Sequence, residues 1–267
     1  MTGIWGILNI TPDSFSDGGR YLDRDTALAH ARMLRAQGAT VIDVGGESTR
    51  PGATRVSADE EQARVLPVIE ALAADGIPVS VDTLNADTAV AAVHAGARIV
   101  NDVSGGLADE RMLHAVAATG ADIALGHWRG PSADMYAHAQ YRRAAREVAS
   151  ELRGRVEAAA AAGIAPSRII LDPGIGFAKS GEQNWEVLRG LDEITSIGPR
   201  VLVGTSRKRF LSEALADAAS DVTEQRRDLG TAVTSVLAAR GGAWAVRVHD
   251  VAGTRDALRV LGAWDGQ

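Results

Sequence analysis

Short apolar segments alternate along the chain with longer segments in which apolar residues recur every three or four positions. The short segments are nearly continuous in apolar residues, many of them β-branched, which is typical of parallel strands buried on both faces. Eight strands are therefore predicted, at residues 3–9, 40–44, 77–82, 98–102, 122–126, 168–172, 200–204 and 243–248.

The longer segments carry charged residues opposite their apolar positions, as amphipathic helices do. Ser57 and Asn85 stand where their side chains can accept hydrogen bonds from the first N–H groups of the following helix. Crossover helices are predicted at residues 24–37, 58–74, 86–95, 109–119 and 141–162, with an extra helix at 222–240 before the last strand.

Eight strand–helix units in 267 residues predict an α/β protein built as a single (β/α)8 TIM barrel. No low-complexity linker or change of composition divides the chain, so one domain is expected over residues 1–267. An open doubly wound sheet has similar local patterns and is the alternative architecture.

The composition excludes several kinds of chemistry. The chain has no cysteine, which rules out disulfides, thiolate zinc sites and a cysteine nucleophile. Its formal net charge of −6 argues against a nucleic-acid surface, which needs a basic footprint. The first residues lack the pattern of a secretory signal, and no apolar run is long enough for a membrane helix. A cytoplasmic protein that binds neither nucleic acid nor membrane is therefore predicted.

Polar residues collect after the predicted strands, whereas the loops before the strands are plain. In a parallel barrel the carboxyl ends of the strands form the active-site face, so these polar residues are expected to meet there. Asp82, Asn101 and Asp172 offer acceptors and an amide suited to a flat heterocycle with several N–H donors. A simpler interpretation stays open, since Asp82 or Asn101 alone could cap the next helix.

Cationic and hydroxyl donors follow other predicted strands. Arginine forks and hydroxyl groups suit phosphate oxygens, so an anion site is predicted from Thr49, Arg50, Arg247 and His249. Asn9 carries an amide oxygen that can ligate a hard cation such as Mg²⁺, which usually binds substrate phosphates as well.

The remaining charged residues after the strands have two interpretations. Asp43, Asp228 and Asp250 can be ion-pair partners with a structural role. Only two of the 28 basic residues are lysines, and both, Lys179 and Lys208, fall in glycine-rich loops. A general drift of composition towards arginine accounts for the preference for arginine over lysine at the surface, but not for the position of these two lysines in glycine-rich loops.

Seven ordered segments at strand ends match one known family. They are NITPDSFSDGG at 9–19, GGESTRPGA at 45–53, SVDT at 80–83, NDVSGG at 101–106, DPGIGFAK at 172–179, SRK at 206–208 and RVHD at 247–250. Through them the chain closely resembles the dihydropteroate synthase family of folate biosynthesis over nearly its whole length.

This resemblance implies a transferase that condenses 6-hydroxymethyl-7,8-dihydropterin diphosphate with 4-aminobenzoate, releasing pyrophosphate and forming 7,8-dihydropteroate. It implies Mg²⁺ as the cofactor and sulfonamides as inhibitors. It also implies the site residues: Asp82, Asn101, Asp172 and Lys208 for the pterin, Thr49, Arg247 and His249 for the diphosphate, Asn9 for Mg²⁺, and Arg50, Pro51, Phe177 and Ser206 around the aminobenzoate.

The implied chemistry places the barrier in bond breaking. An arylamine is barely basic, so it is unprotonated at neutral pH and needs no strong general base. We therefore expect SN1-like loss of diphosphate. The first two strand-end loops, rich in Gly, Ser and Thr, are expected to close only after pterin diphosphate binds, which builds the aminobenzoate site and excludes water from the cation. The catalytic residues are expected to be Asp17, Arg50, Asp82, Asp172, Lys208 and Arg247.

Three positions depart from the family pattern. Gly126 replaces a usual methionine, which is expected to leave one side of the pterin slot looser or packed by Trp128. Gln183 replaces a common histidine, and Ala178 a common glycine. His127 has two interpretations, support of the site or a purely structural role.

Two other functions fit part of the pattern. A pterin-dependent methyltransferase domain would keep the pterin residues on the same barrel, and a paralogue could bind pterin without catalysis. The family is usually a homodimer, which requires an apolar face. Two interpretations are open for Leu211, Leu215, Val233 and Leu237: they form that face, or they pack on the chain's own barrel.

Overall fold

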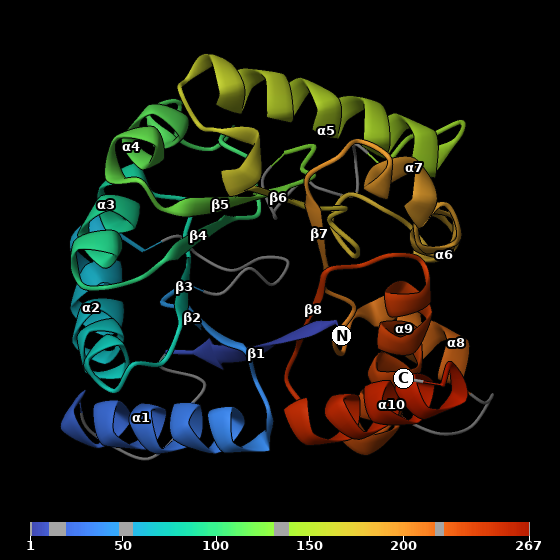
Figure 1. Ribbon diagram of the computed structural model, residues 1–267, viewed down its shortest axis with the longest axis horizontal. Coiled ribbons are helices and arrows are strands. Elements are labelled where there is room, and N and C mark those ends of the chain that lie inside the picture. The colour runs from blue at the N-terminus through green and yellow to red at the C-terminus, as the bar shows by residue number, and fades with distance from the viewer. Residues whose placement is uncertain (1, 11–19, 48–55, 131–138, 217–221, 267) are drawn as a thin grey trace.

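Eight parallel strands close into a barrel in chain order, with helices around it (Figure 1). The computed structural model describes residues 2–10, 20–47, 56–130, 139–216 and 222–266. Pairing of the last strand with the first closes the barrel, so the predicted (β/α)8 architecture is confirmed and the open sheet is wrong. The strands are β1 (Gly3–Asn9), β2 (Val41–Gly45), β3 (Val79–Asp82), β4 (Ile99–Asp102), β5 (Asp122–Gly126), β6 (Ile169–Asp172), β7 (Arg200–Val203) and β8 (Ala245–Val248).

The helices form the outer layer (Figure 1). The extra helix predicted before the last strand is present as α9, and the short α8 precedes it. The helices are α1 (Arg20–Gln37), α2 (Ala58–Ala74), α3 (Ala86–His94), α4 (Met112–Thr119), α5 (Ala144–Ala161), α6 (Gly181–Arg189), α7 (Leu191–Thr195), α8 (Arg209–Leu215), α9 (Glu224–Arg240) and α10 (Val251–Trp264), and a 3-10 turn spans Pro166–Arg168.

Polar side chains start α2 and α3 where the sequence predicts them. Oγ of Ser57 accepts from the backbone N–H of Glu60 at 3.2 Å, and Oδ1 of Asn85 accepts from that of Asp87 at 3.0 Å. Each bond satisfies an N–H group that has no partner inside its own helix.

In the described part of the chain, no helix combines the length and apolar character needed to cross a bilayer. The cytoplasmic location stays a prediction.

An apolar layer fills the barrel at the amino ends of its strands. It is built around Trp5, which is fully buried and meets Trp244 edge-on with ring centroids 6.2 Å apart. A separate, larger core lies between the strands and the surrounding helices. The lumen is therefore solid at one end, and polar side chains have room only towards the carboxyl ends of the strands. The layer consists of Trp5, Val41, Ile99, Ala124, Ile170, Leu202 and Ala245.

Candidate active site

The candidate site lies one inward-facing position beyond the apolar layer. Alternate residues of a strand point to the same face, so a residue two positions after a layer residue also faces the lumen. Asp43, Asn101, Asp172 and Arg247 each stand in this place on their own strand. Glycine takes the corresponding place after the layer residues of β5 and β7, and at Gly204 after β7 this leaves space between the charged groups.

Arg247 is the centre of the charged cluster. Its Nε donates to Oδ2 of Asp43 at 2.5 Å, and its Nη2 donates to Oδ2 of Asp82 at 2.6 Å. Nδ2 of Asn101 donates to the same Asp43 oxygen at 3.1 Å. Three predicted site residues, Asp82, Asn101 and Arg247, are thus brought together. Asp43 is an ion-pair partner, as one interpretation of the sequence has it, but it stands inside the site.

Two buried acceptors in this cluster have no hydrogen-bond partner among the described residues, namely Oδ1 of Asp43 and Oδ1 of Asn101. Their residues are 0% and 1% exposed, so both oxygens lie on the floor of the cluster. Leaving a buried acceptor unpaired costs about 1–3 kcal/mol, and a ligand with N–H donors would recover that cost. The cluster therefore fits a flat heterocycle that presents donors along its edge.

Asp172 and Lys208 complete the cluster from β6 and from the loop after β7. A methyl group placed on Gly204 would lie 3.7 Å from Cβ of Arg247 and 3.9 Å from both Oδ2 of Asp172 and Nζ of Lys208. The Asp172 carboxylate and the Lys208 ammonium therefore meet at the space that the missing side chain of Gly204 leaves, beside the Cβ atom of Arg247. All four predicted pterin residues lie at this one mouth of the barrel.

The loop after β6 supports Lys208. Nζ of Lys208 donates to the backbone carbonyl of Ile175 and lies 4.6 Å from the centroid of the Phe177 ring. Nearer the rim, Oγ of Ser206 lies 2.9 Å from Nδ1 of His249 and accepts from the backbone N–H of His249 at 3.1 Å. Phe177 therefore lies beside Lys208, and Ser206 lies beside His249, while their roles towards aminobenzoate and diphosphate stay predictions.

Asn9 lies at the end of β1, beside the pterin cluster. A methyl group on Gly45 would lie 3.6 Å from Oδ1 of Asn9 and 3.6 Å from Cβ of Asp82. The missing side chain of Gly45 thus leaves space next to the Asn9 amide oxygen.

Other predicted site residues lie outside the described part of the chain: Asp17, Thr49, Arg50 and Pro51.

Burial shifts the ionisation of three of these groups. Burial raises the pKa of Asp82 to about 7, against the effect of Arg247 and with a further rise from Asp43. Burial also raises the pKa of Asp172, opposed by the charge of Lys208. Burial lowers the pKa of Lys208 to about 8, opposed by Asp172. The Asp82 carboxyl and the Lys208 ammonium therefore change charge near neutral pH, as groups in a ligand site often do.

The Asp82 shift predicts an acid limb in the pH profile. A carboxyl with a pKa of about 7 loses its charge as the pH falls below 7, so kcat/KM should fall with it. Asp43→Asn removes a charge that raises this pKa, so the limb should move to lower pH. The measurement is kcat/KM from about pH 5 to pH 9 in both proteins. A limb at unchanged pH in the variant would show that Asp82 does not cause it.

Two departures from the family pattern are explained by local contacts. A Cβ atom on Gly126 would lie 2.3 Å from the carbonyl oxygen of Val103, so the Val103 backbone occupies that space. The expectation of a looser slot at Gly126 is therefore wrong. Gln183 closes the start of α6: its Oε1 accepts from the backbone N–H of Ser180 at 2.7 Å and its Nε2 donates to the carbonyl of Ala139 at 3.1 Å.

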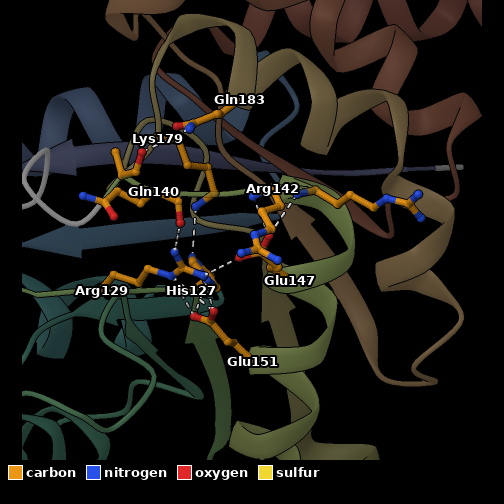
Figure 2. A network of polar contacts seen from close by, with 10 residues as sticks. His127, Arg129, Gln140, Arg142, Glu147, Glu151, Lys179 and Gln183 are labelled. Carbon is orange, nitrogen blue, oxygen red and sulfur yellow. Dashed lines mark hydrogen bonds and ion pairs between the residues drawn. The ribbon is translucent and has the colours of Figure 1, made fainter.

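A buried polar network adjoins the site and was not predicted. Figure 2 shows Lys179 and His127 pointing toward one another, with Glu151 on the far side of the imidazole. Nζ of Lys179 lies 3.0 Å from Nδ1 of His127, and Nε2 of His127 lies 3.0 Å from Oε2 of Glu151. In the sequence, only the rarity of lysine and its place in a glycine-rich loop single out Lys179.

Comparison with known proteins agrees with this geometry. The model of a family described as pterin binding enzyme matches residues 5–249. The chain is 52% identical over 261 residues to dihydropteroate synthase of Mycobacterium leprae (strain TN), covering 97% of this chain and 92% of the relative.

Two solved structures from Xanthomonas albilineans are similar over the whole chain. Its dihydropteroate synthase with 4-aminobenzoic acid is 42% identical with a TM-score of 0.92, covering 100% of this chain and 94% of the other. The same enzyme in complex with 7,8-dihydropteroate is 39% identical with a TM-score of 0.88, with coverage of 100% and 94%.

Proposed function

This chain belongs to the dihydropteroate synthase family, and we propose that it joins 6-hydroxymethyl-7,8-dihydropterin diphosphate to 4-aminobenzoate, yielding 7,8-dihydropteroate and pyrophosphate. The observation that carries the proposal is the gathering of pterin-side and diphosphate-side groups at one mouth of the barrel. Unpaired acceptors on Asp43 and Asn101 stand there beside the Asp172, Lys208 and Arg247 charges.

The pterin binds in the deep part of this mouth. Its ring donors meet the oxygens of Asp82, Asn101 and Asp172, while Lys208 donates to a ring acceptor. Carboxylates also stabilise positive charge that spreads into the ring, since hydrogen bonds to ionised groups are roughly twice as strong as neutral ones. The same groups therefore bind the substrate and favour its cationic form.

Loss of diphosphate starts the reaction. The bond between the methylene carbon and the diphosphate oxygen breaks, and both electrons leave with the oxygen. The arylamine nitrogen then attacks the cationic carbon and afterwards loses one proton to water. Two of the five N–H groups of Arg247 donate to Asp43 and Asp82, so the others remain as donors to the diphosphate. Ser206 and His249 lie nearer the rim and are further donors.

Mg²⁺ fits the space beside Asn9. Among the described residues, no three acidic or histidine side chains are arranged to hold a metal, which suits an ion held largely by water and substrate phosphates. Once bound, Mg²⁺ offsets negative charge on the departing diphosphate. Asn9→Ala should therefore weaken Mg²⁺-dependent binding of pyrophosphate in calorimetry, with little change in binding measured without Mg²⁺.

Pyrophosphate release tests the proposed reaction. The protein is mixed with pterin diphosphate and Mg²⁺, with or without 4-aminobenzoate, and pyrophosphate and dihydropteroate are both measured. We expect equal amounts of the two products, formed only when 4-aminobenzoate is present. Pterin binding without any release would instead indicate a methyltransferase domain or a non-catalytic pterin protein, and would overturn the proposal.

A homodimer through α9 and α10 accounts for the apolar side chains exposed there. Leu229, Val233 and Leu237 recur every four residues on α9 and are 64%, 52% and 58% exposed. Trp264 on the neighbouring α10 is 79% exposed. Leu211 is buried in the chain's own core, so for this residue the alternative of packing on its own barrel is correct.

Sedimentation velocity tests this interface. Wild type should sediment as a dimer, and Val233→Glu with Leu237→Glu should sediment as a monomer, because charges would be buried in the interface. Met33→Glu on α1 is a matched control, since Met33 is also exposed, at 48%, but on another helix. A monomeric wild type, or a dimer that survives both α9 charges, would rule out this interface.

A further inference from the structure

The ammonium of Lys179 is buried and fully coordinated. Lys179 is 2% exposed, and its Nζ lies 2.9 Å from the carbonyl oxygen of Gly174, 3.0 Å from that of Phe177 and 3.0 Å from Nδ1 of His127 (Figure 2). An ammonium has three N–H donors, and each finds one acceptor here. Lys179 therefore ties two points of the loop after β6 to the end of β5.

The segment between those two points touches the pterin-side charges. The backbone N–H of Gly174 donates to Oδ1 of Asp172 at 2.7 Å. The next residue, Ile175, accepts from Nζ of Lys208, and the Phe177 ring lies beside the same ammonium. Lys179 makes no hydrogen bond to Asp172 or Lys208, so it acts on them through this loop and through its charge, which lowers the pKa of Asp172.

The loop is held in a conformation that its sequence does not favour. Ala178, next to Lys179, has φ +48°, a left-handed conformation that costs a residue with a side chain roughly 1–2 kcal/mol. Such a conformation persists only where surrounding contacts determine it. The contacts that hold this loop include the bonds of Lys179 and the bond from Lys208 to the Ile175 carbonyl. Asn184 adds two more: its Oδ1 accepts from the Gly176 N–H at 2.6 Å, and its Nδ2 donates to the Lys179 carbonyl at 3.3 Å.

His127 links this ammonium to a carboxylate on α5. Burial and the charge of Lys179 lower the pKa of His127 to about 4, so the imidazole is neutral. Its Nδ1 accepts from Lys179, which leaves the proton on Nε2 for donation to Glu151. Burial opposes the ionisation of Glu151, but hydrogen bonds from His127 and Arg129 lower its pKa to about 2. Lys179 is thus linked through a neutral imidazole to Glu151, which also pairs with Arg129, while the Asp172 carboxylate favours the charged ammonium more strongly.

We propose that Lys179 is a positioning residue for pterin binding, holding the β6–α6 loop in the shape that sets Asp172 and Lys208. The His127–Glu151 pair keeps its ammonium charged and oriented. This inference rests on the proposed function, since it assigns the loop to the pterin half of that site. It adds a residue that stands outside the substrate pocket.

The pH dependence follows from the groups around Lys179. Burial lowers the pKa of Lys179 to about 7; Asp172 and Glu151 oppose this, while Lys208 and Arg129 reinforce it. Above that pH the neutral amine keeps two N–H groups and can serve only two of its three acceptors. The loop then loses one of its ties, so pterin affinity falls as pH rises.

The test measures pterin diphosphate affinity by calorimetry, from about pH 6 to pH 9, without 4-aminobenzoate. Lys179→Met should weaken binding of pterin diphosphate at least tenfold at neutral pH. Adding Glu151→Gln to Lys179→Met should not change this affinity further. Glu151→Gln alone keeps the hydrogen-bond acceptor but removes the charge, so the alkaline loss of affinity should begin at lower pH. Lys208 also titrates, but Glu151 is not among the charges that shift its pKa.

Glu147→Gln is the matched control. Glu147 stands one turn earlier on α5 and accepts from Arg129 at 3.2 Å, but it does not contact His127. Its variant should leave the pH profile unchanged. If Glu151→Gln and Glu147→Gln behave alike, or Lys179→Met binds pterin diphosphate normally, the inference is overturned. Wild type that fails to bind pterin diphosphate would instead contradict the proposed function.

Discussion

Arg247→Ala is expected to lower kcat roughly 10²- to 10³-fold, the usual loss when one preorganised donor to developing charge is removed. The Arg247 guanidinium pairs with Asp43 and Asp82, and we expect its remaining N–H groups to face the departing diphosphate. Steady-state kinetics with saturating pterin diphosphate and 4-aminobenzoate is the measurement. Near-normal turnover would contradict the role.

The same change removes the partner of two buried carboxylates, which typically costs roughly 3–5 kcal/mol of folding free energy. Stability must therefore be separated from catalysis. Adding Asp43→Asn to Arg247→Ala removes one of the unpaired charges, so part of the lost stability should return in thermal unfolding. Turnover should stay low in the double variant, because the donor for the diphosphate is still missing.

Asp172→Asn should lower kcat about 10²-fold while leaving the fold intact. Asparagine keeps an oxygen for the N–H of Gly174 but loses the negative charge that favours a cationic pterin. Because burial raises the pKa of Asp172, its charged form costs stability above the ordinary pKa of an aspartate. The variant should therefore unfold at the same or a higher temperature than wild type, unlike Arg247→Ala.

Asp122→Asn is the control for this change. Asp122 starts β5, at the opposite mouth of the barrel, and pairs with Arg200 at 2.7 Å. Its loss should leave turnover unchanged. Equal losses of turnover in Asp122→Asn and Asp172→Asn would show that the effect is not specific to the site, and normal turnover in Asp172→Asn would remove this carboxylate from the mechanism.

Much of the barrel was predictable because buried parallel strands leave a strong pattern. The strands and the helix α9 follow from continuous apolar runs and helical periodicity. The starts of α4 and α5 do not, because Met112 and Ala144 stand three residues after the predicted positions 109 and 141. A few residues of amphipathic pattern before a helix do not separate a loop from a first turn.

The site was predictable where chemistry stands at a strand end. Asp82, Asn101, Asp172 and Arg247 were found in this way. Asp43 was placed with structural residues, although it stands two positions after Val41, the same offset that sets Asn101 after Ile99. Comparing these offsets along all strands would have placed it in the lumen.

Other features depend on contacts between residues far apart in sequence. The direction of Lys179 is fixed by His127, 52 residues earlier, and the room at Gly126 is taken by the backbone of Val103. No local pattern encodes either contact, because each arises from how two loops fold over the end of the same barrel. Such features require the three-dimensional structure.

The apolar plug around Trp5 turns the lumen into a cul-de-sac. A ligand on the floor of the lumen must bind before a ligand nearer the rim, and can leave only after that second ligand has left. We therefore expect the pterin substrate to bind before 4-aminobenzoate, and a molecule bound tightly nearer the rim to trap the pterin behind it. Inhibitors that compete with 4-aminobenzoate should accordingly bind more tightly to the enzyme when pterin is already bound.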